Sequence, residues 1–257
     1  MKIASWNVNS LRARQERLLA WLDHHRPDVL CLQEIKAEDT KISLAPFADR
    51  GYHVALYGQR TYNGVAILSR TPLETVERGF GDGGDDSEAR FLAATTGGIR
   101  VLSVYVPNGE TLDSPKFAAK LEWLARLERW LDTHQVVHEP AALCGDLNVA
   151  PAELDVHDPQ AWEHSVLYAP PAREALARLL HLGFVDVVRQ CHPGERLYTW
   201  WDYRMLAFPK NRGLRIDHLL FSPALAARVV AAGVDRDARK GKLPSDHAPV
   251  WAELGPA

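Results

Sequence analysis

Short apolar stretches that end in polar residues recur along most of the chain. Their length and their content of branched side chains favour strands that are buried on one or both faces. The stretches are Lys2–Trp6, Val29–Leu32, His53–Leu56, Val65–Leu68, Val101–Val106, Ala141–Cys144, Ile216–Phe221 and Val250–Ala252.

Helical periodicity is clearest over Pro115–Gln135, where Pro115 can open the first turn. Leu11–His25 and Arg173–Leu182 show the same spacing more weakly. Helices therefore alternate with strands, whereas residues 65–106 contain strands with no helix between them. This pattern predicts mixed sheets covered by helices, and the strands suffice for two sheets packed face to face. The apolar stripe of the longest predicted helix consists of Phe117, Leu121, Leu124 and Leu131.

The length and punctuation of the chain predict one domain over residues 1–257. A chain of 257 residues lies at the upper end for a single compact domain, and no linker divides it. The Gly- and Asp-rich segment Gly79–Asp86 is predicted to be a hairpin loop rather than a domain boundary.

Charge and cysteine content narrow the class of protein. With 33 acidic and 30 basic residues, the net charge of −3 excludes binding of nucleic acid through bulk positive charge, so a polyanion would need a local basic patch. The 3 cysteines include no Cys-x-x-Cys pair, which favours a reducing compartment. Because no signal-peptide or membrane-spanning run is found, we expect a cytoplasmic protein that does not bind membranes.

Polar side chains stand beside the ends of the apolar strands. If the strands bring these ends to one edge of a sandwich, they form a pocket with four acidic groups surrounded by Asn, Tyr and His. Charged groups are costly to bury unless they are paired or bind a metal. The segments are Trp6–Asn9, Leu32–Glu34, Val104–Asn108, Cys144–Asn148, Arg215–His218 and Ser245–His247.

The chemistry of these groups favours a hard cation. Oxygen ligands without a Cys or His cluster suit Mg²⁺ or Mn²⁺ better than zinc. Asp146 and Asn148 are two residues apart, so an extended segment would present both on one face, where the carboxylate could take a proton from water and the amide could hold a phosphoryl oxygen. A buried carboxylate partner would fix the tautomer of His247.

Each residue also has a simpler interpretation. Asn7 and Asp146 could be turn formers, Glu34 could lie at a solvated edge, and Asp217 could pair with Arg215 or Arg212. The recurrence of polar groups at strand ends favours a site over these separate explanations. The sequence contains no Gly-x-Ser-x-Gly motif, P-loop or dinucleotide-binding fingerprint.

At these residues the chain resembles the exonuclease III family of apurinic/apyrimidinic endonucleases, within the endonuclease–exonuclease–phosphatase superfamily. The resemblance runs from Lys2–Ala13 to Ser245–Val250. It implies a four-layered α/β sandwich, in which two mixed β-sheets pack face to face and are flanked by helices. The most specific motifs are Leu32–Lys36, Gly145–Pro151, Asn211–Asp217 and the closing Ser245-Asp246-His247.

The resemblance also implies roles for individual residues. Glu34 would be the principal Mg²⁺ ligand, with Asn7 beside it and Asp246 in the metal environment. Mn²⁺ could replace Mg²⁺, and a second ion could bind Asp146, Asn148 and His247. The catalytic set would comprise Asp146, which activates water, Asn148, which holds a phosphate oxygen, His247 with Asp217 on the scissile phosphate, and Tyr105.

Contacts with DNA follow from the same resemblance. Trp200, Leu214 and Ile216 match an apolar pocket for a flipped sugar that lacks its base, and extrusion costs least when no base is stacked. Other residues could bind the phosphate backbone. They are Arg12, Arg14, Lys36, Arg90, Asn108, Lys210, Asn211 and Arg212. The chain departs from the family at Asn9 and Ile35, both of which we expect at the rim of the site.

The resemblance therefore predicts a Mg²⁺-dependent DNA repair hydrolase, an exodeoxyribonuclease III-like enzyme. It would cut duplex DNA 5′ to abasic sites, act on blocked 3′ ends as a phosphatase or phosphodiesterase, degrade strands in the 3′→5′ direction, and work as a monomer. Two alternatives stay open: a catalytically silent regulator that binds nucleic acid on the same fold, and a phosphodiesterase that acts on a substrate other than DNA.

Overall fold

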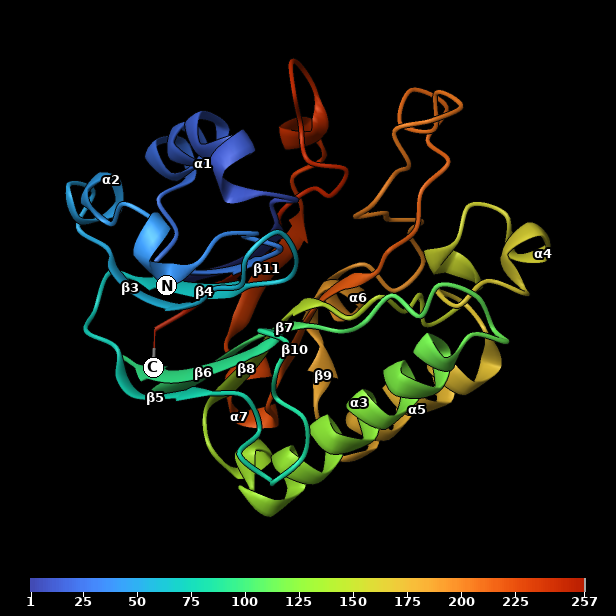
Figure 1. The fold of residues 1–257 in the computed structure, drawn as a ribbon, viewed down its shortest axis with the longest axis horizontal. Helices are drawn as coiled ribbons and strands as arrows, with labels where there is room; N and C mark the ends of the chain where they lie inside the picture. The colour runs from blue at the N-terminus through green and yellow to red at the C-terminus, as the bar shows by residue number, and fades with distance from the viewer. Residues whose placement is uncertain (257) are drawn as a thin grey trace.

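Two six-stranded sheets pack against each other in the computed structural model, which describes residues 1–256 (Figure 1). In spatial order, the first sheet contains β11 (Val229–Val234), β12 (Val250–Leu254), β1 (Lys2–Asn7), β2 (Val29–Gln33), β4 (Val65–Ser69) and β3 (His53–Tyr57). The second contains β5 (Glu74–Arg78), β6 (Phe91–Thr96), β7 (Ile99–Tyr105), β8 (Ala141–Asp146), β10 (Asp217–Phe221) and β9 (Val185–Asp186).

Each sheet contains one parallel pair of strands near its centre. In the first sheet, β1 and β2 are parallel and are joined through helix α1 (Leu11–His25). In the second, β7 and β8 are parallel and are joined through α3 (Pro115–Thr133). The other strand pairs in the described residues are antiparallel. Because parallel neighbours need a long crossover, these two helices fix the arrangement of each sheet.

Local sequence signals explain where the two crossover helices begin. The hydroxyl of Ser10 accepts a hydrogen bond from the amide of Ala13 at the start of α1. Ser114 caps α3 in the same way, and Pro115 occupies its first turn, where no amide donor is needed. Helix α1 ends at His25 and is followed by Arg26, which has a left-handed backbone and whose amide donates to the carbonyl of Leu22.

Helices cover the outer faces of both sheets, so the molecule has four layers (Figure 1). Helix α1 packs on the first sheet, while α3 and α5 pack on the second. The shorter α-helices are α2 (Ala45–Ala48), α4 (Pro159–Trp162), α5 (Pro170–His181), α6 (Val187–Cys191) and α7 (Pro223–Ala226). The 3₁₀ helices are η1 (Asp39–Lys41), η2 (Val136–His138), η3 (Glu153–Asp155) and η4 (Arg236–Arg239).

The core between the sheets explains why the strands read as apolar runs. Every residue of β2, β4 and β8 is buried, because both faces of these central strands are covered. Side chains from the two sheets meet in one layer, to which Val29, Ile67, Val101, Leu219 and Phe221 contribute.

The predicted α/β sandwich of two mixed sheets is confirmed. All the strands predicted from apolar runs are present, and Gly79–Asp86 lies in the loop that connects the antiparallel neighbours β5 and β6. Strands β5, β6, β9 and β11 are not among the predicted runs. Among residues 1–256, no helix is both long enough and apolar enough to cross a membrane.

Candidate active site

The site lies where the carboxyl ends of both parallel pairs meet. In the first sheet, Asn7 pairs in register with Gln33, and Glu34 follows directly. In the second, Tyr105 pairs with Asp146. Strand β10 runs antiparallel to β8, so its first residue, Asp217, also lies opposite Asp146. Open α/β sheets commonly bind ligands at the carboxyl ends of their strands.

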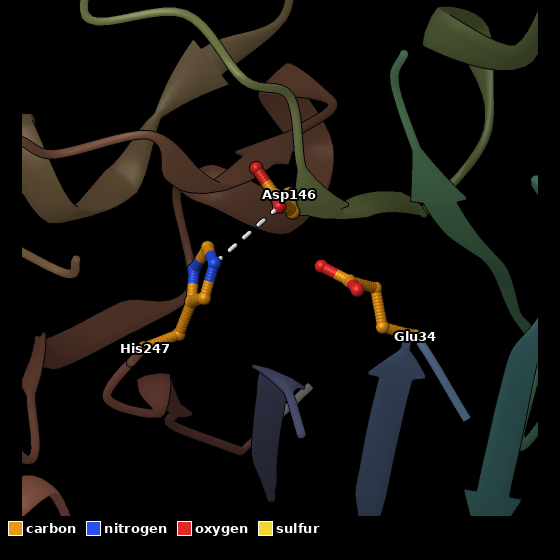
Figure 2. Close-up of side chains that lie close together, drawn as sticks. All are labelled: Glu34, Asp146 and His247. Carbon is orange, nitrogen blue, oxygen red and sulfur yellow. Dashed lines mark ion pairs between the residues drawn. The ribbon is translucent and has the colours of Figure 1, made fainter. Parts of the chain in front are cut away.

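Glu34, Asp146 and His247 come together from three distant parts of the chain (Figure 2). One potential ligand atom from each residue lies within 4.8 Å of the others. Asp146 and His247 are buried, whereas Glu34 is half-buried. Figure 2 shows the carboxylate of Glu34 directed toward Asp146, across from the imidazole of His247. The polar ends of the predicted strands therefore converge, as the sequence predicts.

Asp146 is held by donors on both of its oxygens. Its Oδ2 accepts a hydrogen bond of 2.9 Å from Nδ2 of Asn7, and its Oδ1 accepts one of 2.9 Å from the amide of Asn148. Burial raises the pKa of Asp146 to about 7, and the nearby carboxylates of Asp217 and Glu34 act in the same direction against His247. A carboxylate with such a pKa can take a proton near neutral pH.

His247 forms a buried pair with Asp217. Its Nδ1 lies 2.8 Å from Oδ2 of Asp217, and its Nε2 lies 3.7 Å from Oδ2 of Asp146. Burial alone would lower the pKa of His247, but the two carboxylates outweigh it and raise the pKa to about 10. The imidazole is therefore protonated at neutral pH, with Nε2–H directed into the site. The sequence left the partner of Asp217 open. In the structure Asp217 binds His247, whereas Arg215 binds Asp155 and Asp186.

Glu34 is positioned by Asn7 and Lys36. Its Oε1 accepts a hydrogen bond of 2.8 Å from Nδ2 of Asn7, and its Oε2 lies 2.7 Å from Nζ of Lys36. Both Glu34 and Lys36 have left-handed backbone conformations, with φ of 52° and 53°. Asn7 thus directs its amide nitrogen toward Glu34 and Asp146, and its oxygen accepts the amide of Asn9. In this arrangement the amide nitrogen of Asn7 orients the two acids. To bind a metal ion, Asn7 would have to present its side-chain oxygen instead.

The donor set fits a hard divalent cation. Four carboxylates, those of Glu34, Asp146, Asp217 and Asp246, surround the site, and burial has left Oδ1 of Asp217 without a hydrogen-bond partner. Carboxylate oxygens are the ligands that Mg²⁺ and Mn²⁺ prefer. Asp246 lies outside the three-residue cluster, and its oxygens accept hydrogen bonds from Asn9 and Trp200.

The turn after β8 differs from the expected extended segment. Asn148 has a left-handed backbone with φ of 51°, so it does not share a strand face with Asp146. Its Nδ2 donates to the carbonyl of Val106, and its Oδ1 accepts a bond of 3.4 Å from Asn108. The expectation of an extended Asp-x-Asn is therefore wrong: the chain turns so that the Asn148 amide can bind the Asp146 carboxylate.

Tyr105 lies beside the acidic cluster. Burial, together with the carboxylates of Glu34 and Asp146, raises the pKa of Tyr105 well above its usual range. The guanidinium of Arg90 lies 4.7 Å from the centre of the Tyr105 ring, and it also donates to Glu88 and to the carbonyl of Tyr105. Tyr105 is therefore a neutral phenol, and Arg90 is a buried cation behind it rather than a free surface charge.

The three residues of the predicted apolar pocket differ in accessibility. Trp200 is half-buried, and its Nε1 donates to Oδ2 of Asp246 at 3.0 Å. Leu214 and Ile216 are 0% and 1% exposed, so they lie in the core behind Trp200. In this structure a sugar could contact only Trp200 of the three. Trp162 on α4 packs edge-on against Trp200, with ring centres 6.0 Å apart.

The predicted backbone-binding residues form two groups. Arg12, Asn108, Lys210, Asn211 and Arg212 are exposed. Lys36, Arg14 and Arg90 are instead engaged within the protein.

Arg12 and Lys36 also line a cavity of about 670 Å³ together with Lys41 and Arg60. This cavity supplies a local concentration of basic groups next to Glu34, which the net charge of the chain does not reveal.

The two departures from the family have different surroundings. Asn9 lies at the rim, where its Nδ2 donates to Asp246 and its Oδ1 accepts a bond from Lys36. Ile35 is fully buried and packs in the core between α1 and the first sheet. The prediction that Ile35 reaches the rim is wrong, because the backbone turns at Glu34 and directs the next side chain inward.

Sequence reasoning missed Lys120. This residue of α3 is 0% exposed, and its Nζ reaches the turn that carries Asn148. A signal was available: Lys120 lies three residues after Phe117 and four before Leu124, on the apolar stripe of the helix. A charged residue on a buried stripe needs a polar partner.

The fold and the site together define a class of protein. The sequence profile of the endonuclease/exonuclease/phosphatase family matches residues 4–247, so the chain belongs to this family. Among curated relatives, exodeoxyribonuclease III of Haemophilus influenzae is 36% identical over 266 residues, covering 99% of this chain and 100% of that protein. The DNA repair nuclease APEX1 of Danio rerio is 33% identical over 256 residues, covering 97% of this chain and 81% of that protein.

Solved structures agree with this placement. An AP endonuclease from Archaeoglobus fulgidus is 42% identical and superposes with a TM-score of 0.96 over 99% of each chain. A variant of a 3′ phosphatase from Neisseria, bound to a product DNA hairpin, is 44% identical with a TM-score of 0.97, again over 99% of each chain. The resemblance to the exonuclease III family predicted from the motifs is confirmed.

Proposed function

We propose that this protein is a Mg²⁺-dependent DNA repair nuclease that cuts duplex DNA 5′ to abasic sites and also removes blocking groups and nucleotides from 3′ ends. The relatives support the class, a hydrolytic nuclease of DNA repair with activities at 3′ ends. The observation that carries the proposal is the convergence of Glu34, Asp146 and His247 within 4.8 Å.

The residues divide the work of phosphodiester hydrolysis. Asp146, with both oxygens held by Asn7 and Asn148 and a pKa of about 7, takes the proton of the attacking water. Protonated His247, held by Asp217, donates from Nε2 to an oxygen of the scissile phosphate and stabilises the charge that develops there. The neutral phenol of Tyr105, beside Glu34 and Asp146, adds a second donor.

Glu34 would be the principal ligand of the metal ion, with Asp246 in its surroundings, and Mg²⁺ is the proposed ion, with Mn²⁺ able to replace it. When bound, the cation neutralises charge on the phosphoryl and leaving oxygens. The gathering of several carboxylates around the site supports this assignment, because carboxylate oxygens are preferred ligands of such ions. Asn7 would then serve as an orienting donor or, after rotation of its amide, as a ligand.

Abasic-site preference rests on two features. Trp200 offers an accessible aromatic face beside Asp246. Exposed Arg12, Asn211 and Arg212 can bind backbone phosphates. A nucleotide that lacks its base costs less to extrude from the duplex than a normal one, so selectivity can arise without direct base contacts.

Side-by-side rates test the function. The purified protein with Mg²⁺ should nick a duplex carrying a tetrahydrofuran abasic analogue, release phosphate from a 3′-phosphate duplex, and shorten a recessed end. Addition of EDTA in excess should abolish all three activities, and Mg²⁺ should restore them. Failure to nick the abasic duplex would remove the proposed incision; activity on a non-DNA phosphodiester alone would favour the other phosphodiesterase class.

A metal titration tests the ligand assignment. Glu34→Ala should raise the Mg²⁺ concentration for half-maximal activity by about 10–100-fold, the range seen when metal-site partners are lost. Lys41→Ala, at an exposed residue that lines the neighbouring cavity, serves as the matched control and should leave the titration midpoint unchanged. An unchanged titration for Glu34→Ala would remove this residue from the ligand set.

A single catalytic domain over residues 1–257, a monomeric state and a cytoplasmic location stay predictions. Light scattering of the purified protein across a range of concentrations tests the second of these.

A further inference from the structure

Lys120 is a buried ammonium group directly beneath the active-site turns. It projects from α3, is 0% exposed, and has no salt-bridge partner among residues 1–256. Burial lowers its pKa to about 7, against the attraction of Asp146. Holding such a group inside the protein costs free energy unless all three of its donors are satisfied.

Three backbone carbonyls satisfy Lys120. Its Nζ donates to the carbonyls of Asn148 and Val166 at 2.7 Å each, and to that of Asn108 at 3.1 Å. These carbonyls belong to three separate segments: the turn after β7, the turn after β8, and the connection between α4 and α5. One side chain therefore ties together the two turns that follow Tyr105 and Asp146.

Gly109 packs against the side chain of Lys120, where there is no room for a larger residue. Gly109 has φ of +101°, and a Cβ at this position would lie 3.2 Å from Cδ of Lys120 and 3.2 Å from the ring of Phe117. A larger residue would press against the lysine stem. A backbone conformation that favours glycine therefore lies against the stem of the buried lysine.

The contact continues from Lys120 to the acid that takes the proton. Lys120 binds the carbonyl of Asn148, whose backbone is held in the left-handed conformation. The amide of the same residue donates to Oδ1 of Asp146 at 2.9 Å. Asn148 is also linked to Asn108, whose carbonyl is the third acceptor of Lys120. A shift of this turn would therefore move the donor that aligns the Asp146 carboxylate.

We propose that Lys120 is a positioning residue for hydrolysis, which fixes the turns after β7 and β8 and thereby aligns the carboxylate of Asp146 through the amide of Asn148. This inference rests on the proposed function, since it assigns the alignment of the base in that reaction. Lys120 does not touch the substrate, so its loss changes the rate of the chemical step and leaves DNA binding nearly intact.

Kinetics of Lys120→Met test the role. Methionine keeps most of the volume and removes the three donors. We expect kcat on the abasic duplex to fall about 10–100-fold, the range for residues that orient a site from behind, with KM changed less than about twofold. Lys120→Gln, which retains two N–H donors, should recover part of the loss. An unchanged kcat for Lys120→Met in an active enzyme would overturn the proposal, whereas an inactive wild-type protein would instead overturn the proposed function.

A double-mutant cycle separates alignment of Asp146 from general loosening. In the Asp146→Asn background, measured in single turnovers at high enzyme concentration, Lys120→Met should change the residual rate less than about twofold, because the base it aligns is absent. An equal loss in both backgrounds would mean that Lys120 acts independently of Asp146, and would overturn the proposal.

Arg126→Met is the matched control on the same helix. The guanidinium of Arg126 donates to Asp82 and Asp86 in the β5–β6 loop, away from the site. This variant should lower the melting temperature without lowering kcat. A comparable loss of kcat would show that any weakening of α3 suffices, which would overturn the specific role. If neither Lys120→Met nor Lys120→Gln folds, Lys120 is a determinant of the fold, and the positioning role is rejected.

Discussion

Two charged clusters meet near the start of β10: the active site, to which Asp217 contributes, and a second cluster around Arg215. They differ in their balance of acidic and basic groups. Asp217 faces the active site, where Asp146 and Asp217 both lie next to the imidazolium of His247 and Glu34 pairs with Lys36. Two residues earlier, Arg215 turns the other way. Its guanidinium, 1% exposed, binds Asp155 and Asp186 at 2.6 Å each, and Arg189 adds a second cation at Asp155.

The two clusters shift their aspartates in opposite directions. Burial would raise the pKa of Asp186, but the charge of Arg215 outweighs it and holds the pKa well below its usual range. Asp146 is buried without such a guanidinium, and burial, reinforced by the neighbouring acids, raises its pKa to about 7. In the Arg215 cluster, which we call matched, cations balance the acids and hold the backbone next to Leu214, Ile216 and Asp217. In the active site, which we call mismatched, acids are in excess, and Asp146 can exchange a proton near neutral pH.

The largest expected effect is on turnover in the mismatched cluster. Asp146→Asn should lower kcat by about 10²–10⁴-fold, the contribution of a positioned base, while leaving affinity for DNA nearly unchanged. Its stability should be equal to or greater than that of the wild type, since a desolvated acid is removed. Steady-state rates, a DNA-binding titration and urea unfolding measure the three quantities. Weakened binding as the main effect would contradict the role of base.

A substitution in the matched cluster around Arg215 should lower the stability of the protein more than its activity. Arg215→Met leaves Asp155 and Asp186 buried without their main partner, so the free energy of unfolding should fall by about 3–5 kcal/mol. Activity per folded molecule should change only a few-fold at low temperature. Urea unfolding combined with active-site titration separates the two effects. A fully folded protein with unchanged stability would show that the cluster is not a structural one.

The pH dependence of stability sharpens the comparison. Because Asp186 has a lowered pKa in the folded state, its stabilising contribution is present above its unfolded pKa of about 3.9 and is lost as the pH falls through the folded value. Asp186→Asn should therefore be less stable than the wild type at pH 5–7, by about 1–3 kcal/mol. The gap should narrow below about pH 4. Urea unfolding at several pH values measures it; a gap that widens in acid would reverse the assigned sign.

The smallest effect concerns substrate preference. Trp200→Ala should reduce incision at an abasic site several-fold more than stepwise removal of nucleotides, because only the former places a bare sugar against the indole. The ratio of the two rates is the measurement. Trp201→Phe, in the neighbouring core cluster, is the control and should lower both rates together. Equal losses for Trp200→Ala would make Trp200 a packing residue.

The sequence predicted the fold well because its strands are buried on both faces. Runs such as Val29–Leu32 and Val65–Leu68 match β2 and β4 almost residue for residue. Strand β5 could not be recognised in this way, since it lies at the edge of its sheet and most of its residues are exposed. Strand β9 consists of two residues and carries no pattern.

The sequence predicted which residues form the site more completely than it predicted their hydrogen-bond partners. The recurrence of polar groups at strand ends identified Glu34, Asp146 and His247, because strands of one sheet deliver their ends to one edge. Hydrogen-bond partners depend on turns that no periodicity encodes. The left-handed backbone at Asn148 and the inward direction of Ile35 both follow from such turns.

Buried charges were the hardest to assign from sequence. By charge alone, Arg215 and Arg212 were equally good partners for Asp217; only the family resemblance pointed to His247, with which the structure pairs it. Lys120 was hidden because its position on the apolar stripe resembles that of its neighbours Phe117 and Leu124. Recognising it requires knowing which carbonyls approach the helix from 28 and 46 residues away along the chain.

The placement of the cluster across two sheets has a consequence for how the protein acquires activity. Glu34 follows a strand of the first sheet, Asp146 ends a strand of the second, and His247 precedes β12, which pairs with β1 near the opposite end of the sequence. A nascent chain therefore holds no competent centre until its last strand docks beside its first. During refolding, recovery of nuclease activity should report that closing event rather than the earlier collapse of either half.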